Sequence, residues 1–427
     1  MKGFLAVAIL LAFILPADAI DYYVATTGND VTGAGTEANP WATPYRAVQA
    51  GLTPGDKVHL VPGTYTDHHY VTIPAPEGGG VTAWFLITAS GSPDRPITFV
   101  SDTKWGAIFD CRGTATGGIF ISASYVVFDG IQMTCPGAYS LAAGVYNDNG
   151  HVTFRRMYVH DWASTCLSTG AFATGTATPG YTNIGHNVFD GNVIRHIGAN
   201  SPSPAGSTGA KCNQTHGIYE GSPHASIVNN IVSGVVGFGI HVYGGGVCYD
   251  TITNNTAFDN SQGGIVVQQD SATHPDYCSG QGTSHNLVNN NTAVNNGFAR
   301  DFSNTPYSGQ DTGIHIYGVS GSDNSDCNNI VYGNNGENQC RNFSTNCTNN
   351  LTGTDSSVFV NYEADKNWAP AETFNFNNYQ LHSGSPAIQA GISHGAPATD
   401  IVGNPRPSDK PDIGAFQYVK ACGCLLQ

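Results

Sequence analysis

Short apolar segments recur along this chain, and each starts at a glycine and alternates apolar with other side chains. Six of them align on that glycine: GIFIS (Gly118), GVYND (Gly144), GIYEG (Gly217), GIHVY (Gly239), GIVVQ (Gly264) and GIHIY (Gly313). The starts lie 26 residues apart from Gly118 to Gly144, 22 from Gly217 to Gly239 and 25 from Gly239 to Gly264. A period of two predicts strands, and a repeat of this length predicts stacked coils. We therefore expect these glycines to form one vertical file.

A second set of segments precedes the first at a constant offset. Val228 lies 11 residues before Gly239, and Thr253 lies 11 residues before Gly264. The members of this set are YVVFDGIQM (125–133), HVTFRRMYV (151–159), NVFDGNVIR (187–195), SIVNNIVSG (226–234), TITNNTAFD (251–259) and NLVNNNTAV (286–294). Asn229, Asn254 and Asn289 recur at one turn, and we expect their side chains to form an internal hydrogen-bond ladder.

These patterns predict an all-β protein, a single-stranded right-handed parallel β-helix. One such unit cannot bury its apolar face alone, whereas stacked units can. A helical solenoid is excluded because the β-branched residues and the Gly and Asn turns do not fit a period of 3.6. The segment PYRAVQAGL (44–52) is typical of a short helix capping the N-terminal end. The period is lost after about residue 352, where we expect an irregular C-terminal cap of a single domain spanning residues 20–427.

Three insertions interrupt the repeat. The step from Gly264 to Gly313 contains only one segment of the second set, so we interpret it as one coil with two insertions, 270–284 and 298–311. A third insertion, 198–214, precedes Gly217. Long loops in a compact repeat are usually functional or disordered, and these three flank the same few strands.

The N-terminal segment and the composition indicate the location of the protein and limit its possible partners. Residues 1–19 read as a secretory signal peptide, with one Lys, an apolar run and Ala-Asp-Ala before the cleavage site, so we expect an exported protein with no membrane span. The formal net charge is −15 with only 16 Lys and Arg, which argues against nucleic acid as a partner and also disfavours polyanionic sugars. We expect a monomer.

Eleven cysteines in an exported chain indicate disulfides, with one thiol left over. Cys111 and Cys135 lie 24 residues apart, about one coil, so the chain returns to the same side of the helix. We expect these two residues to be bonded, because their Cα atoms can approach to roughly 5.5 Å.

Two stretches of the chain resemble a known superfamily. Residues 22–65 (YYVATTGNDVTGAGTEANPWATPYRAVQAGLTPGDKVHLVPGTY) are similar to the opening of many secreted bacterial β-helix proteins of the pectate-lyase-like superfamily, and 379–418 are similar to their C-terminal segment. The resemblance implies the fold and export but not the activity, because the superfamily includes lyases, hydrolases, epimerases and binding modules. The Asp clusters that carry calcium in pectate lyases are missing, as is the paired-Asp and Gly-His-Gly pattern of the pectin hydrolases.

The outward positions of the aligned strands carry the candidate chemistry. We expect successive coils to present Phe120, Tyr146, Tyr219, His241, Val266 and His315 two residues after the aligned glycine. His241 and His315 should then lie roughly 10 Å apart, with Val266 between them. Imidazoles transfer protons and tyrosines donate them, while aromatic faces bind sugar rings. We predict these catalytic residues: His241, Tyr219 and His216. The predicted substrate-binding residues are Tyr243, Gln268, His315, Tyr317, Lys211 and Arg300.

Other interpretations of this face remain open. Outward Tyr and His also stabilise sheets, so the stripe could be plain sheet surface. A zinc site at His216, His241 and Glu220 is weakly supported, and Glu220 falls on an inward position. We therefore predict no metal and no cofactor, with calcium left open.

The function we favour is a polysaccharide lyase that cleaves a uronate-containing polysaccharide by β-elimination. A His-Tyr set supplies the base and the acid for this reaction, and Lys211, Arg300 or Gln268 could neutralise the carboxylate. A glycoside hydrolase needs two carboxyl groups, and the nearby candidates are Glu220, Asp270, Asp148 and Asp311. A C5-epimerase and a non-catalytic polysaccharide-binding module are the remaining alternatives.

Overall fold

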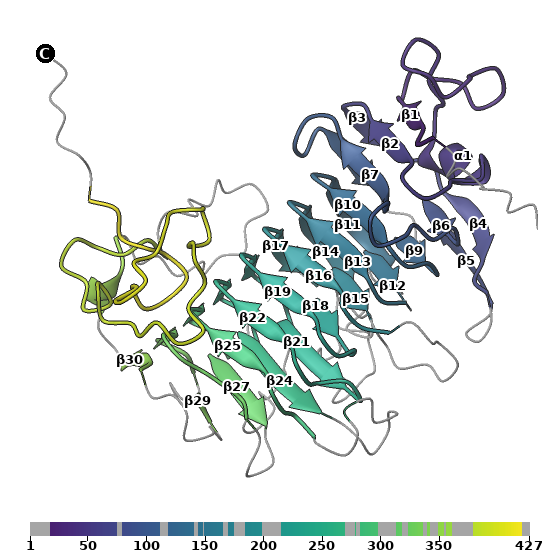
Figure 1. Ribbon diagram of the computed structural model, residues 1–427. Coiled ribbons are helices and arrows are strands. Elements are labelled where there is room, and N and C mark those ends of the chain that lie inside the picture. The colour runs from purple at the N-terminus through teal and green to yellow at the C-terminus, as the bar shows by residue number, and fades with distance from the viewer. Residues whose placement is uncertain are drawn as a thin grey trace, which may run out of the picture.

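The computed structural model describes most of the repeat region. The described residues are 18–74, 79–111, 118–140, 144–147, 149–164, 170–174, 184–198, 215–269, 278, 282–297, 313–317, 323–335, 340–341, 349–353, 356–360 and 379–420. The expected signal peptide, apart from its last two residues, lies outside them. Strands stack side by side from the purple N-terminal end to the green coils near β30 (Figure 1).

Three parallel sheets run the length of this stack. The first contains β1 (Asp21–Val24), β2 (Lys57–Leu60), β7 (Ile97–Ser101), β10 (Val126–Asp129), β13 (Val152–Arg155), β16 (Val188–Asp190), β19 (Ser226–Val228), β22 (Thr251–Thr253) and β25 (Leu287–Asn289). The second contains β3 (Gly63–Tyr65), β8 (Ala107–Asp110), β11 (Gln132–Ser140), β14 (Tyr158–Ser164), β17 (Val193–Ile197), β20 (Ile231–Ser233), β23 (Thr256–Phe258), β26 (Thr292–Val294), β28 (Ile330–Tyr332) and β30 (Leu351–Gly353). The third contains β6 (Phe85–Ile87), β9 (Ile119–Ile121), β12 (Val145–Asn147), β15 (Phe172–Thr174), β18 (His216–Glu220), β21 (Phe238–Gly244), β24 (Ile265–Gln269), β27 (Ile314–Tyr317) and β29 (Cys340–Arg341).

Each coil contributes one strand to each sheet in turn, which makes the molecule the predicted right-handed parallel β-helix. The exception to parallel pairing among the described strands is a hairpin of β4 (His69–Thr72) and β5 (Gly80–Ala83) near the N-terminal end. No described helix is long and apolar enough to cross a membrane.

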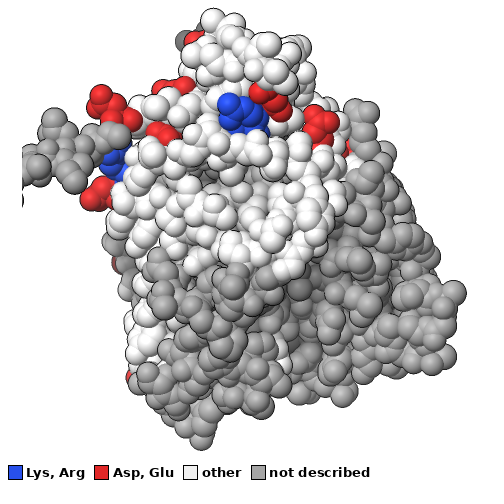
Figure 2. Space-filling model, turned by 90° about the vertical axis from the view of Figure 1, so that its right-hand side faces the viewer, with Lys and Arg blue, Asp and Glu red and all other residues white. Residues whose placement is uncertain are grey.

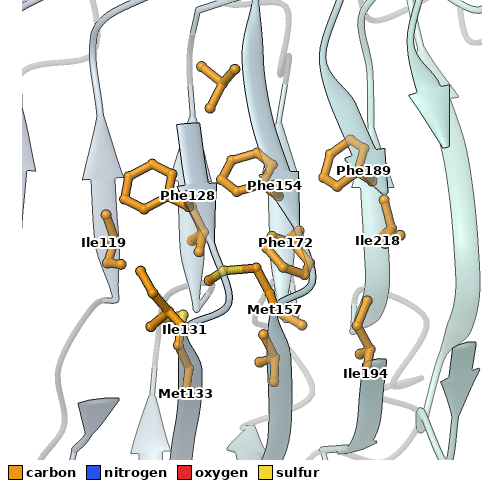
Figure 3. Packing of buried hydrophobic residues seen from close by; sticks show 14 of the residues in the cluster. Ile119, Phe128, Ile131, Met133, Phe154, Met157, Phe172, Phe189, Ile194 and Ile218 are labelled. Atoms are coloured by element: carbon orange, nitrogen blue, oxygen red, sulfur yellow. The ribbon is translucent and has the colours of Figure 1, made fainter. Parts of the chain in front are cut away.

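The interior is filled by like residues stacked from coil to coil. Phe99, Phe128, Phe154 and Phe189 are fully buried, with successive ring centroids 5.4, 5.7 and 5.3 Å apart. Figure 3 shows the last three of these rings in a row. Truncating one such ring to alanine typically costs about 3–5 kcal/mol, so this row contributes strongly to stability.

The predicted glycine file exists, and it contains one coil that the alignment missed. Ala171 lies between Gly144 and Gly217 in the register, since β15 pairs with both β12 and β18. Glycine is favoured at these positions because the neighbouring coil lies too close for a side chain. A Cβ atom on Gly239 would lie 2.6 Å from Nδ2 of Asn260 and 2.7 Å from the Gly264 carbonyl oxygen.

An asparagine ladder does run through the turn between the first and second sheets. Asn254 donates to Asn229 at 3.2 Å, as predicted, but Asn289 pairs with Thr253 and the next position on the ladder is Asn290. A longer buried ladder lies one residue further along the chain. Its members are Asn192, Asn230, Asn255, Asn291 and Asn329, linked by amide-to-carbonyl bonds of 2.9–3.2 Å. Each step satisfies buried polar groups that would otherwise destabilise the core.

The described disulfides cross-link neighbouring coils. Cys111 and Cys135 are bonded with Cα atoms 5.0 Å apart, which confirms the prediction from their spacing. Cys248 and Cys278 form a second bond, which the sequence spacing did not indicate.

Both ends of the repeat carry additional segments. A helix, α1 (Pro44–Gln49), is shorter than the predicted 44–52, begins after the N-cap Thr43 and packs Ala47 into the core. After β30 and a short 3-10 helix, η2 (Ser356–Val358), the described C-terminal residues pack along the side of the last coils, seen in yellow in Figure 1. The closing role of these two segments stays a prediction.

Candidate functional site

The outer face of the third sheet places the predicted site residues in a column. Strand register gives the order Phe120, Tyr146, Ala173, Tyr219, His241, Val266 and His315. The prediction missed only Ala173, because its coil has alanine in place of the aligned glycine. A parallel column two residues further along holds Tyr243, Gln268 and Tyr317, as predicted.

The side chains of Tyr219 and His241, together with that of His216, form a compact cluster of rings. The His216 centroid lies 5.0 Å from that of Tyr219 and 4.9 Å from that of His241. Tyr219 approaches His241 edge-on at 5.8 Å. The cluster arises because β18 pairs with β21, which places Tyr219 opposite His241. His216 is the first residue of β18, three residues before Tyr219. The structure thus brings together the three residues predicted to be catalytic.

Two aromatic neighbours hold His241 in place. The ring centroid of Phe238, at the start of β21, lies 4.5 Å from that of His241, and the Tyr243 centroid lies 4.9 Å from it. Tyr219 and Tyr243 are themselves 6.5 Å apart. Aromatic pairs at such separations contribute favourably beyond the area they bury. Within the part of the chain that the structure describes, aromatic contacts and not polar groups therefore position His241.

The imidazoles of this cluster are buried and neutral. His216 is 4% exposed and His241 is 7% exposed. Among the described residues, Nδ1 of His216 and both ring nitrogens of His241 have no hydrogen-bond partner. Burial lowers the pKa of His241 to about 3, and burial followed by the proximity of His241 lowers the pKa of His216 well below its usual value. These unprotonated rings can accept a hydrogen bond or a proton from a bound ligand.

The other predicted binding residues are spread along the same face. His315 is buried and lies two coils from His241, with Val266 between, as predicted. Gln268 is partly exposed between the strand positions of Tyr243 and Tyr317. The side chain of Tyr317 lies outside the described residues, as do Lys211 and Arg300.

Glu220 lies inside the β-helix, as its inward position predicted. Its carboxyl group accepts hydrogen bonds from Oγ1 of Thr174 at 2.5 Å and Nδ2 of Asn187 at 3.1 Å, and also from Ser222. Burial raises the pKa of Glu220 although these bonds oppose the shift. Glu220 is therefore an interior polar anchor and cannot join His216 and His241 on the outer face. No group of three or more His, Cys, Asp and Glu side chains that could hold a metal ion occurs within the described ranges.

A second polar cluster, which sequence reasoning missed, lies on the neighbouring strands β14 and β17 in the middle of the second sheet. Asp161 receives hydrogen bonds from Nδ1 of His160 at 2.8 Å and Nδ1 of His196 at 3.1 Å. Burial raises the pKa of Asp161, but these two bonds outweigh it and hold the pKa well below its usual range. Arg195 pairs with His160 in the register, and the Tyr158 ring stacks on His160 at 4.1 Å.

Little in the residue pattern indicates this second cluster. Asp161 and His196 adopt left-handed backbone conformations, with φ of 49° and 53°, and lie opposite each other between the pairs His160–Arg195 and Trp162–Ile197. A left-handed residue interrupts the alternation of side chains along a strand, which lets both residues reach the His160 side of β14. Only the adjacent His160 and Asp161 in the sequence could have suggested it.

The comparisons with known proteins agree with the fold. Residues 22–199 match the model of the Pel9A-like right-handed beta helix region. The chain is thus a right-handed parallel β-helix protein, and the resemblance to the pectate-lyase-like superfamily is confirmed.

The individual proteins that the chain resembles share limited sequence identity with it. The chain is 29% identical over 171 residues to pectate lyase L of Dickeya dadantii and, equally, to pectate lyase L of Dickeya chrysanthemi. These alignments cover 38% of this chain and 37% of each relative, so the chain matches little more than a third of their length. The crystal structure of pectate lyase Pel9A superposes with a TM-score of 0.55 at 17% identity, covering 94% of this chain and 97% of that one, which shows a shared fold.

Proposed function

We propose that this protein is a secreted polysaccharide lyase that cleaves a uronate-containing polysaccharide by β-elimination at the His216–Tyr219–His241 cluster. The observation that carries the proposal is the convergence of two neutral imidazoles and a phenol on the outer face of the third sheet. The relatives named pectate lyase support the substrate class, and the two described disulfides within the chain fit an oxidising, extracellular location.

The chemistry divides between the three residues. β-Elimination removes the proton beside the uronate carboxyl group, forms a carbon–carbon double bond and expels the glycosidic oxygen of the next sugar. In the proposal His241 accepts the proton and Tyr219 donates one to the departing oxygen, while His216 positions the pair. Tyr243, Gln268, His315 and Tyr317 would contact neighbouring sugar units, and Lys211 or Arg300 would neutralise the carboxylate.

The low pKa of His241 has a consequence for this mechanism. With a pKa of about 3, His241 is a weak base while no substrate is bound. An anionic carboxylate placed beside a buried imidazole favours the protonated ring and raises the pKa. A uronate substrate would therefore strengthen the base that attacks it, whereas a neutral sugar would not.

The alternatives find less support in the described residues. A hydrolase requires two carboxyl groups on either side of the bond. Of its four candidates, Glu220 is enclosed in the interior, while Asp148, Asp270 and Asp311 lie outside the described residues. A C5-epimerase would use the same cluster but return a proton to the opposite face of the sugar. A binding module would need only the tyrosines.

A substrate panel tests the proposal. The purified protein is incubated with polygalacturonate, rhamnogalacturonan and alginate, each with EDTA and with added calcium, and unsaturated product is followed by ultraviolet absorbance. A lyase produces this absorbance on at least one polymer. New reducing ends without it would indicate a hydrolase, and altered uronate stereochemistry without cleavage would indicate an epimerase.

A matched pair of tyrosine variants then locates the site. Tyr219→Phe removes the proposed acid, and Tyr146→Phe removes the hydroxyl of another tyrosine in the same column, two coils earlier. We expect turnover to fall by about 10²–10⁴-fold in the first variant and to stay near wild type in the second. Equal activities would place the chemistry elsewhere.

A further inference from the structure

A column of stacked aromatic rings follows the turn that leads into the first sheet, away from the third-sheet site. Adjacent ring centroids lie 4.5–5.0 Å apart, and adjacent planes are inclined by only 5–22°. Equivalent positions in successive coils supply the rings, and we call them the ring column: Tyr125, His151, His186, His224, Tyr249 and His285.

The backbone makes this column costly to build from large residues. All six residues adopt a left-handed conformation, with φ between 57° and 61°. Few residues other than glycine take this conformation readily, although Asn, Asp and His are enriched there. At the turn between the first and second sheets the same conformation is held by Gly130, Arg156, Gly191, Asn229 and Asn254. Glycine, asparagine and arginine thus satisfy the neighbouring turn, so this backbone conformation does not by itself require a row of aromatic rings.

The arrangement of the rings excludes two kinds of ligand. Their faces are covered by one another, so they offer no free face on which a sugar could stack. Nearly parallel imidazoles 4.7 Å apart direct their nitrogens side by side, whereas zinc requires nitrogens that converge at about 2.0–2.1 Å from one ion. What the column presents to solvent is a line of ring edges carrying N–H and O–H groups.

Protonation turns this line of edges into a line of cations. His186 and His224 are exposed, His151 is partly exposed and the His285 side chain is 34% exposed. Partial burial, and then the neighbouring His186, lower the pKa values of His151 and His224, so these rings become charged only at acidic pH. Among the described residues the charged group beside the column is Asp323, which lies 3.7 Å from His285 at its end. Asp250 follows Tyr249 in the chain but is buried, its carboxyl group accepts from the backbone N–H of Ala225, and burial raises its pKa well above the usual value, which favours the uncharged acid.

Permanent cations are scarce elsewhere in this protein. The chain has only 16 Lys and Arg among 427 residues, against 31 Asp and Glu. The face in Figure 2 shows few blue side chains among its described residues. A set of imidazoles spaced at the interval between coils is therefore an unusual concentration of potential positive charge.

We propose that the ring column is a second carbohydrate-binding site, on which an extended polyanionic polysaccharide lies along the helix axis when the imidazoles are protonated. The supporting argument is charge complementarity between a linear polyanion and a straight row of cationic edges. This site would hold the polymer at mildly acidic pH and release it near neutrality. The proposal does not depend on catalysis at the third sheet.

A pair of double variants tests this proposal at constant total charge. His186→Tyr with His224→Tyr removes the two exposed imidazoles and replaces them with the residue that the column already uses at Tyr125 and Tyr249. His382→Tyr with His394→Tyr removes two exposed imidazoles far from the column in sequence, as the matched control. Far-ultraviolet circular dichroism and the melting temperature establish that each variant folds.

The measurement is the affinity for dextran sulfate, a polyanion without uronate, by calorimetry at about pH 5 and about pH 7.5, the range in which histidines titrate. Neutral dextran is the uncharged control. We expect the wild type and the control variant to bind more tightly at the lower pH, and the column variant to lose roughly three- to tenfold of that affinity. The wild-type gain should also weaken with added salt. If both double variants behave alike, or the wild type shows no gain, the ring column is only part of the scaffold and the proposal is wrong.

Discussion

The histidines of the third sheet and those of the ring column are the same side chain in opposite surroundings. His216, His241 and His315 are buried on the outer face of a sheet, whereas His186 and His224 present their edges to solvent. Burial lowers the pKa of His241 to about 3, and the pKa of His224 is lowered as well, by partial burial and by His186. Position on the coil therefore decides whether an imidazole serves as a neutral acceptor or as a proton-dependent cation.

The largest expected effect separates the two groups by activity. Replacing His241 with alanine removes the proposed proton acceptor, so kcat should fall by about 10²–10⁴-fold on the true substrate. His224→Tyr should leave kcat unchanged, because the ring column takes no part in the chemistry. Steady-state kinetics and melting temperatures of both variants check this. Full activity of His241→Ala would reduce the third-sheet cluster to sheet surface.

Acid stability should separate the two groups next. In the unfolded chain His241 binds a proton near pH 6.5, but in the folded protein only near pH 3, so stability falls as the pH drops through this window. The contribution reaches about 4 to 5 kcal/mol at the lower end. His241→Phe, which cannot titrate, should lose that much less stability between the two pH values in denaturant titrations. His224→Tyr should change the acid slope only slightly, and an equal change in both variants would contradict the contrast in burial.

A buried carboxyl group, Asp250, should change stability with pH in the opposite direction to His241. Asp250 occupies a ladder position: its Oδ1 accepts from the Ala225 N–H, while its own N–H donates to Asn286. Burial raises its pKa well above the usual value, so stability decreases as pH rises from about 4 toward the folded-state pKa. Asp250→Asn keeps the shape and removes the acid. We expect a gain of about 1–3 kcal/mol at neutral pH and none in strong acid. Loss of stability at neutral pH would show that the carboxylate is needed.

The smallest expected effect concerns substrate contact beside His241. Tyr243 lies 4.9 Å from the His241 ring and would bind a neighbouring sugar rather than transfer a proton. Tyr243→Leu should raise KM by roughly two- to tenfold with little change in kcat, since one aromatic contact contributes about 0.5–1.5 kcal/mol. A fall in kcat as large as that of His241→Ala would instead assign Tyr243 to the chemistry.

The fold could be predicted because its physical cause is local and repeated. Alternation of apolar residues after a glycine identifies six strands of the third sheet (β9, β12, β18, β21, β24 and β27), and the close approach of coils at Gly239 explains why the glycine recurs. Because the prediction relies on this local pattern, it fails where the pattern changes. Ala171 replaces the glycine in one coil, so that coil was missed. Asn289 was placed on the ladder instead of Asn290 because a one-residue shift in register is invisible where three asparagines follow one another.

The candidate site could be predicted only in part. Register alone places Tyr219 beside His241, and the ring contacts follow from it. The burial of His241, and with it the low pKa, depends on neighbours that a strand pattern does not reveal. Asp161 and His196 were not predicted, because a left-handed residue inside a strand cannot be recognised from the alternation of apolar and polar residues in the sequence. The ring column could have been found, since Tyr125 and His151 directly precede aligned strands at a constant offset.

The asparagine turn has a consequence for the order in which the chain matures during synthesis. Asn254 donates to the Thr399 carbonyl oxygen, Asn349 donates to that of Ala390, and Arg406 donates to Asn254. A growing chain that has just completed the coil ending at Asn349 has not yet made these partners. Its turn amides lack these partners until residues 390–406 have been synthesised. We therefore expect a chain truncated before residue 390 to be cleaved more readily by proteases at this turn than the full chain.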